Sequence, residues 1–194
     1  LIALTTAHFY EDVKIVGIFD DTEKDLWMPM RWLPHIWDDK KESRFLAFGY
    51  EEAHRLCERM NDVLESRKRS VAGQSYGPVR QKPHYIFILG SRDCVVREPI
   101  MENLTLNQQA MGVSTLFLFD EMYALPHGCQ FIIDMDHDPS AYERDKMNQK
   151  FIFTTDPEIP LNKFDAFARG MSAIRLEGFG GMRDIPDSVT FLQG

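Results

Sequence analysis

The sequence predicts an α/β protein in which a mostly parallel sheet lies between two layers of helices. Short, strongly apolar segments alternate with segments of helical periodicity along the 194-residue chain. The apolar segments lack the strict alternation of a half-exposed strand, which indicates a sheet that is covered on both faces. This combination is typical of three-layer α/β folds.

The first expected strand covers residues 13–21, with the sequence VKIVGIFDD, and ends in Asp20 and Asp21. Residues 22–43 then contain two prolines and all three tryptophans of the chain. Because disordered segments lack aromatic residues, we expect a structured excursion with a helical turn here. A short strand at 44–48 follows.

The clearest helix is expected at residues 50–70. Its apolar residues recur at spacings of three and four, which predicts one buried face. Acidic residues lie near its start and basic residues near its end, as the helix dipole favours. A polar, glycine-containing loop at 71–82 then leads to a buried strand at 84–90.

The remaining elements continue the alternation of strands and helices. We expect strands at 113–120, 129–135 and 150–156, a charged loop between the last two, and helices at 98–112 and 161–172. Residues 1–177 are predicted to form one domain and residues 178–194 an exit linker. The opening LIALTTAHF reads as the tail of a helix, so we expect the chain to be a piece of a longer protein.

Composition narrows the class of protein. The net charge of −8 argues against a nucleic-acid binder, which usually has a basic excess, and favours a basic partner. The three cysteines are an odd number without CxxC spacing, so we expect reduced thiols and neither a disulfide framework nor a zinc site. No segment is apolar enough over a sufficient length to span a bilayer.

Polar and charged residues follow several predicted strands, where α/β proteins bind ligands. They are Asp20 and Asp21, Gly90 to Arg92, Asp120 and Glu121, and Thr154 to Asp156. A phosphate site would also need a glycine-rich loop that enters a helix. The chain contains no GxxxxGK[ST] motif, and GFGGMR at 178–183 reads as a flexible turn.

Two other clusters allow more than one interpretation. Asp134, Asp136 and His137 could hold a hard cation in a metal-dependent enzyme, but they lack the spacing of an EF-hand, so a solvated loop is favoured. A cysteine nucleophile near His127 has no evident partner in the sequence.

The segment WMPMRWLPHIW, residues 27–37, has two readings that the sequence leaves open. It is either a lid over the core or a docking surface, because Trp, Met and Arg are enriched at interfaces. We expect Trp32 and Leu33 to point inward, and Arg31, His35 or Trp37 outward. The candidate docking residues are Arg31, Trp32, His35 and Trp37.

Taken in order, these segments resemble one domain of the EssC/EccC proteins, the membrane-anchored FtsK/SpoIIIE-like coupling ATPases of type VII secretion systems. The WLPH step and the closing PDSVTFL are the most specific parts. The resemblance covers nearly the whole chain and implies a RecA-like (P-loop-NTPase-like) fold. It further implies a membrane-proximal domain on the cytoplasmic side of the membrane. Its implied partners are the downstream ATPase modules of the same chain, other membrane components of the machine and secreted substrate proteins, with no nucleic acid.

The resemblance also implies a degenerate nucleotide site. The strand at 84–90 matches the strand that delivers the Walker B acids, yet Gly90 and Ser91 stand at those positions. The phosphate loop would precede Leu1. Without an acid, magnesium is weakly held and water is not oriented. We therefore expect a non-catalytic module with no ATP or magnesium of its own.

The alternative is a nucleotide-binding or weakly active ATPase domain that is completed by residues outside this piece. Its crevice residues would be Asp20, Arg92 and Asp120.

Overall fold

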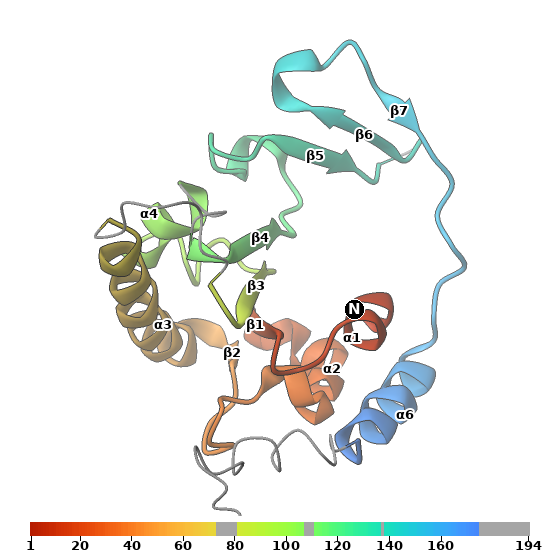
Figure 1. Ribbon diagram of the computed structural model, residues 1–194. Helices are drawn as coiled ribbons and strands as arrows, with labels where there is room; N and C mark the ends of the chain where they lie inside the picture. Colours follow the sequence, from red (N-terminus) through yellow and green to blue (C-terminus); the bar gives the residue numbers. More distant parts are fainter. Residues whose placement is uncertain (73–80, 107–110, 137, 175–194) are drawn as a thin grey trace, which may run out of the picture.

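The computed structural model describes residues 1–72, 81–106, 111–136 and 138–174 of the chain (Figure 1). Its centre is a four-stranded parallel sheet in the order β2-β1-β3-β4. The strands are β1 (Val13–Phe19), β2 (Leu46–Phe48), β3 (His84–Leu89) and β4 (Val113–Phe117). The predicted α/β fold with a mostly parallel sheet is confirmed, and its layout is consistent with a RecA-like arrangement.

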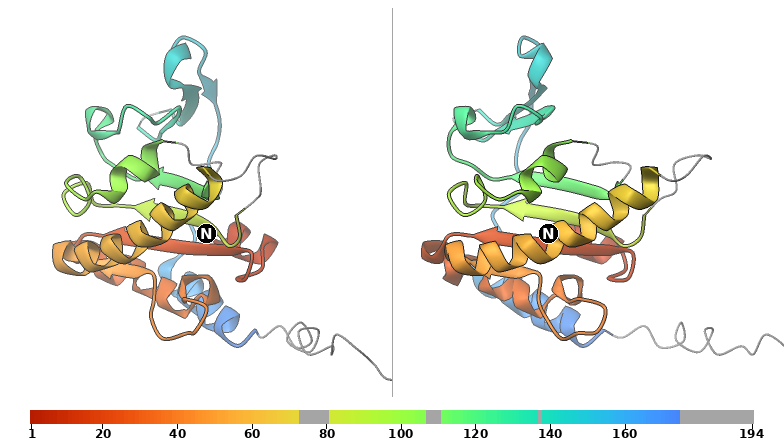
Figure 2. Two further views of the ribbon diagram at one scale, coloured as in Figure 1. Left: turned by 60° about the vertical axis from the view of Figure 1, so that its left-hand side comes forward. Right: turned by 90° about the vertical axis from the view of Figure 1, so that its left-hand side faces the viewer.

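Helices cover both faces of this sheet, as the continuous apolar strands require (Figure 2). One face packs against α3 (Gly49–Ala72) and α4 (Ile100–Thr105). The other face packs against α1, the Trp-rich excursion and α6. These are α1 (Ile2–Ala7), η1 (Asp21–Glu23), α2 (Lys24–Trp27), η2 (Met28–Trp32), η3 (Pro34–Ile36) and α6 (Leu161–Ser172).

Strand β1 is buried along its whole length, although it contains a lysine. The Lys14 ammonium reaches the edge of the core, where it donates a hydrogen bond to the Trp37 carbonyl oxygen at 2.8 Å and pairs with Asp39 at 3.3 Å. These partners satisfy the charge that the strand would otherwise bury alone. The lysine thereby ties the central strand to the end of the Trp-rich excursion.

Helix α3 confirms the longest predicted helix and buries the predicted face. Ala53, Leu56, Met60 and Leu64 all lie in the core between α3 and the sheet. Near its end, the buried Arg67 guanidinium donates to the carbonyl oxygens of Met111 (2.9 Å) and Pro83 (2.8 Å). The helix end is therefore fixed to the segments that begin β3 and β4.

A second sheet corrects the prediction for the last strands. The sequence predicts strands at 129–135 and 150–156 with a charged loop between them, as parts of an α/β fold with a mostly parallel sheet. Instead, β5 (Phe131–Asp134), β6 (Ser140–Glu143) and β7 (Phe151–Ile152) form a separate antiparallel sheet in that order. The connections between these strands are too short for the crossover helix that parallel pairing needs, whereas hairpins need none.

The second sheet stands at the β4 side of the molecule and is joined to α6 by an extended strap, residues 153–160 (Figure 1). Short 3-10 helices η4 (Met122–Ala124) and η5 (Arg144–Lys146) lie in its connections. The helix expected at 98–112 ends at Thr105, and Gly112 has a positive φ of 66° just before β4. Most of the loop expected at 71–82 and the exit linker expected at 178–194 lie outside the described residues, as does the boundary at 177.

Among the helices in the described ranges, none combines the length and the apolar character needed to cross a bilayer.

Candidate functional site

The carboxyl ends of β1 and β3 form the switch point of the main sheet. From β1 the chain proceeds to β2 on one side and then to β3 on the other, so the two connections leave in opposite directions. Ligands of open α/β sheets bind at such points. The structure brings the predicted residues together here: Gly90 donates its N–H to the Ile18 carbonyl oxygen at 2.8 Å, which places Gly90 beside the end of β1 and Asp20.

The space beside Gly90 is filled by the protein's own side chains. The Phe19 ring is fully buried, and a Cβ atom added at Gly90 would lie only 2.5 Å from it and 3.3 Å from the Glu23 carboxylate. Trp27 stacks on Phe19, with ring centroids 4.3 Å apart and an angle of 10° between the planes. The switch point is therefore packed at the position where the Walker B acids were expected.

The acids that follow β1 have local structural roles. Oδ1 of Asp20 accepts hydrogen bonds from the backbone N–H (2.9 Å) and the hydroxyl (2.8 Å) of Thr22, which caps η1. These bonds lower the pKa of the Asp20 carboxyl. The Asp21 carboxylate packs against Gly49 at the start of α3 and occupies the space that a side chain there would need, and the positive φ of 70° also favours glycine. The segment after β1 is therefore a short 3-10 helix capped by Asp20, and no glycine-rich loop follows the strand.

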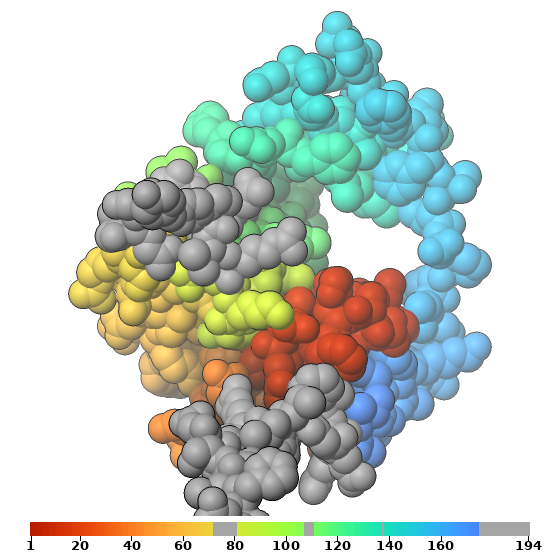
Figure 3. All heavy atoms as spheres, in the orientation of Figure 1, coloured from red at the N-terminus to blue at the C-terminus, as the bar shows by residue number. Residues whose placement is uncertain are grey.

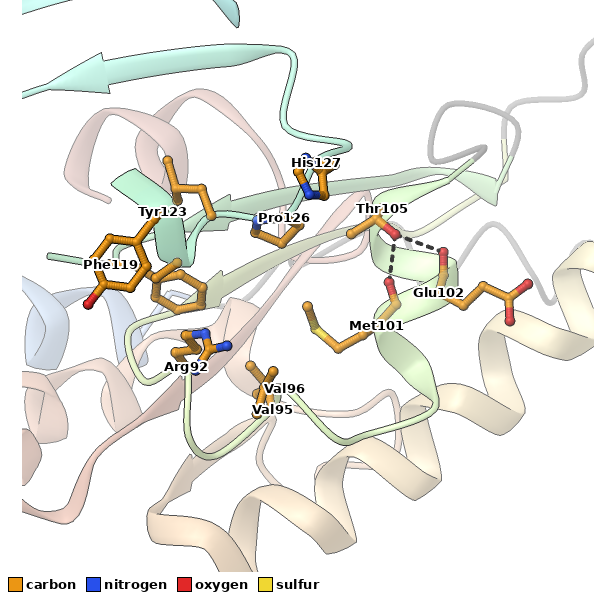
Figure 4. Close-up of a pocket in the computed structure, with 12 residues that line it drawn as sticks. Arg92, Val95, Val96, Met101, Glu102, Thr105, Phe119, Tyr123, Pro126 and His127 are labelled. Carbon is orange, nitrogen blue, oxygen red and sulfur yellow. Dashed lines mark hydrogen bonds between the residues drawn. The ribbon is translucent and has the colours of Figure 1, made fainter. Parts of the chain in front are cut away.

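An open cavity of about 410 Å³ lies instead at the carboxyl ends of β3 and β4 (Figure 4). Its walls come from the segment after β3, from α4, and from the segment around η4. The lining residues are Arg92, Val95, Val96, Met101, Glu102, Thr105, Phe119, Tyr123, Ala124, Leu125, Pro126 and His127. Of the predicted crevice residues, only Arg92 lines this cavity; Asp120 follows the lining residue Phe119 but is not itself part of the lining.

The cavity combines apolar walls with few polar groups. Arg92 lies beside Phe119 at one end, and His127 lies with Thr105 and Glu102 at the other (Figure 4). The Arg92 side chain is half exposed, and its nearest acid is Asp93 at 4.0 Å, so the guanidinium remains available to an anion. The arrangement can hold a small group with an apolar body and an anionic end. The sequence did indicate Arg92, but nothing in it pointed to the apolar walls.

Metal and thiol chemistry receive no support from the described residues. Within them, no three His, Cys, Asp or Glu side chains are grouped closely enough to hold a metal ion. The Asp134 carboxylate instead accepts a hydrogen bond from the Asp136 backbone N–H at 3.1 Å, while His137 lies outside the described part of the chain. Burial raises the pKa of the Cys57 thiol to about 12 and also raises that of Cys129 near His127, which opposes thiolate formation.

The Trp-rich excursion is largely a lid, and its outer part holds α6. Leu33 is fully buried, as predicted. Trp32 is half-buried between two guanidinium groups, with the Arg31 Cζ atom 4.9 Å and the Arg169 Cζ atom 4.6 Å from its ring centroid. Because Arg169 belongs to α6, Arg31 and Trp32 form an internal docking surface for that helix.

The two remaining candidates of this excursion behave differently. His35 is only 1% exposed and forms a 2.9 Å hydrogen bond with the His8 carbonyl oxygen, so the expectation that it points outward is wrong. Burial lowers the pKa of His35, which favours its neutral ring. Trp37 is half-buried and stacks on the Arg44 guanidinium at 4.0 Å, away from α6.

The fold is that of an α/β domain with a parallel sheet, and its layout is consistent with a RecA-like arrangement. No protein-family model matches the chain. It is similar over 188 residues, at 23% identity, to the ESX secretion system protein EccC of Geobacillus thermodenitrificans. It is similar over 197 residues, at 22% identity, to the type VII secretion system protein EssC of Staphylococcus aureus. These matches cover 96% and 100% of the chain, so the chain is an EssC/EccC-related domain. It spans only 12% and 13% of the length of those relatives.

Proposed function

We propose that this domain is a non-catalytic ATPase-like module of a type VII secretion coupling protein. It links a membrane anchor to downstream motor modules and thereby supports protein export. The names of the relatives, which are type VII and ESX secretion proteins, support the role in secretion. The proposed partners are the following modules of the same chain, other components of the machine and its secreted substrates, at the cytoplasmic side of the membrane.

One observation carries the non-catalytic part of this proposal. β3 is followed by Gly90 and Ser91, and Phe19, on which Trp27 stacks, packs against Gly90. Phosphoryl transfer depends on a metal ion held by acids and on an oriented nucleophile. A crevice filled by aromatic rings supplies neither of these.

The strand-end cavity favours a second candidate function, nucleotide binding without hydrolysis. Arg92 offers a guanidinium for a phosphate, and Phe119 and Tyr123 offer aromatic faces for a base. Such a nucleotide would act as a structural ligand of the loops after β3 and β4.

A calorimetric titration of the chain with ATP, with and without magnesium, tests both candidates. For the non-catalytic module we expect no saturable heat up to about 1 mM ATP, because the switch point is filled. For the second candidate, binding should be independent of magnesium and should be lost in Arg92→Ala. Arg97→Ala is the matched control, since Arg97 is an exposed arginine of the same segment outside the cavity lining. Magnesium-dependent binding that survives Arg92→Ala would contradict both candidates.

A further inference from the structure

The second sheet buries one face over β5 and β6 and leaves the other face open. Its pairing register aligns Ile133 with Ala141 and Ala141 with Phe151, so these side chains share one face with Phe131. On this face Phe131, Ile133 and Phe151 are 58%, 57% and 71% exposed. We call these three residues the open apolar face.

The opposite face of the same sheet is covered over β5 and β6, although Ile152 of β7 is exposed there. Ile132 and Tyr142, which are paired across β5 and β6, are buried there. The Tyr142 hydroxyl reaches the Met122 sulfur of η4 at 3.7 Å. The open apolar face therefore lies on the side of the sheet away from η4, and no described residue buries it.

The second sheet also borders an opening in the molecule. An opening lies between the second sheet, the strap of residues 153–160, α1 and β4 (Figure 3). Two of the bordering segments carry exposed apolar side chains, namely Leu116 of β4 with Leu118 just after it, and Ile159 of the strap. Single exposed apolar residues are common, but several on adjoining elements indicate an interaction surface.

The surroundings of this surface are strongly acidic. Residues 120–160 contain nine acidic and three basic side chains, a net charge of −6 out of −8 for the whole chain. Glu143 is exposed and lies opposite Phe131 on the open apolar face itself, where its carboxylate is paired with Lys146 at 2.6 Å, so the net negative charge comes from the remaining acids. A negative potential of this kind attracts basic segments and repels acidic ones.

We propose that the open apolar face binds a segment of a partner protein that is rich in both large apolar and basic residues. The apolar side chains of this segment cover Phe131, Ile133 and Phe151, and its Lys or Arg side chains meet the acids around them. A second copy of this chain fits poorly, since it would bring its own acidic segment against the same charges. The surface is separate from the switch point, so the proposal does not depend on the nucleotide state.

The test uses the 194-residue chain and three fluorescein-labelled peptides of about twelve residues. The first peptide mixes Lys with Phe and Leu, the second has Glu in place of Lys, and the third has Ser in place of Phe and Leu. We expect the first peptide to bind in fluorescence anisotropy at least about tenfold more tightly than either of the others.

Two variants of one strand provide the matched comparison. Phe151→Ser removes a residue of the open apolar face, whereas Ile152→Ser removes its neighbour, which is 78% exposed but points to the opposite face. We expect Phe151→Ser to weaken binding about tenfold and Ile152→Ser to weaken it less than about twofold. Circular dichroism of both variants confirms that they remain folded.

Several outcomes would overturn the proposal. Equal loss in the two variants would show that binding is not specific to this face, and equal binding of the serine peptide would show a purely electrostatic attraction. Equal binding of the glutamate peptide would show that the acids do not contribute to binding. Absence of binding by the first peptide would show that the open apolar face is not such a binding site. A dimer in sedimentation that Phe151→Ser dissociates would make a second copy the occupant.

Discussion

Gly90→Asp, which places an acid at a position expected for the Walker B motif, should destabilise the domain rather than give it ATPase activity. We expect the free energy of unfolding to fall by about 2–4 kcal/mol. The new Cβ would meet the Phe19 ring at 2.5 Å, and this ring cannot yield because it is fully buried and stacked on Trp27. The added carboxylate would also lie close to Glu23, a second acid.

Urea unfolding and a phosphate-release assay measure the two parts of this prediction. Gly170→Ala is the control, since Gly170 lies in α6 with no atom within 4 Å of an added Cβ. It should stabilise the protein by about 0.5–1 kcal/mol through helix propensity. Gly90→Ala should be destabilising, because the contact with Phe19 needs only a Cβ. A Gly90→Asp variant that is as stable as the parent and binds magnesium-ATP would show that the crevice is open, against the proposed function.

The parallel core was predictable because its strands are apolar without interruption. β1 and β3 follow from VKIVGIF and from HYIFIL, and α3 follows from its periodic apolar residues. The separate antiparallel sheet was not predicted, because a short apolar strand has the same local sequence pattern in a parallel sheet and in a hairpin. The connection between residues 135 and 150 did contain the relevant information: it has no helical pattern, so a parallel crossover could not form there.

The candidate site was predictable only in part. The rule that ligands bind at strand ends selected Asp20, Gly90 and Arg92, and the structure places them near the ends of β1 and β3. The filling of the crevice was not predictable, because the rings that fill it come from the strand itself and from α2. The lining of the strand-end cavity depends likewise on how η4 packs against α4, which is a tertiary arrangement without a sequence signal.

The second large effect on stability is expected at the internal docking surface for α6, which Arg31 and Trp32 form. Phe164, Phe167 and Met171 of α6 pack against the core beneath the excursion, and Trp32 lies between Arg31 and Arg169. If the domain passes conformation from one end of the chain to the other, α6 is the element through which the end of the chain is coupled to the sheet. The strength of this contact then sets how rigid the coupling is.

We expect Trp32→Ala to lower the free energy of unfolding by about 3 kcal/mol, since a large aromatic contact and two cation–π contacts are lost. The α6 helix should loosen first, so cleavage in the strap at 153–160 should become faster in limited proteolysis. Trp37→Ala is the matched control, because Trp37 is also half-buried and stacked on an arginine but does not contact α6. Its loss should cost about 1 kcal/mol and leave strap cleavage unchanged.

Trp32→Ala and Trp37→Ala can also be introduced into the full-length protein, where secretion is measured. Trp32→Ala should impair secretion more than Trp37→Ala does, because Trp32 contacts Arg169 of α6 whereas Trp37 stacks on Arg44. A third variant, Arg169→Lys, keeps the charge and much of the packing but loses the planar group over the indole ring, so an intermediate defect is expected. Normal secretion by a Trp32→Ala protein whose strap is cleaved faster would show that α6 holds the domain together without transmitting anything, and the linking role would have to be assigned to another surface.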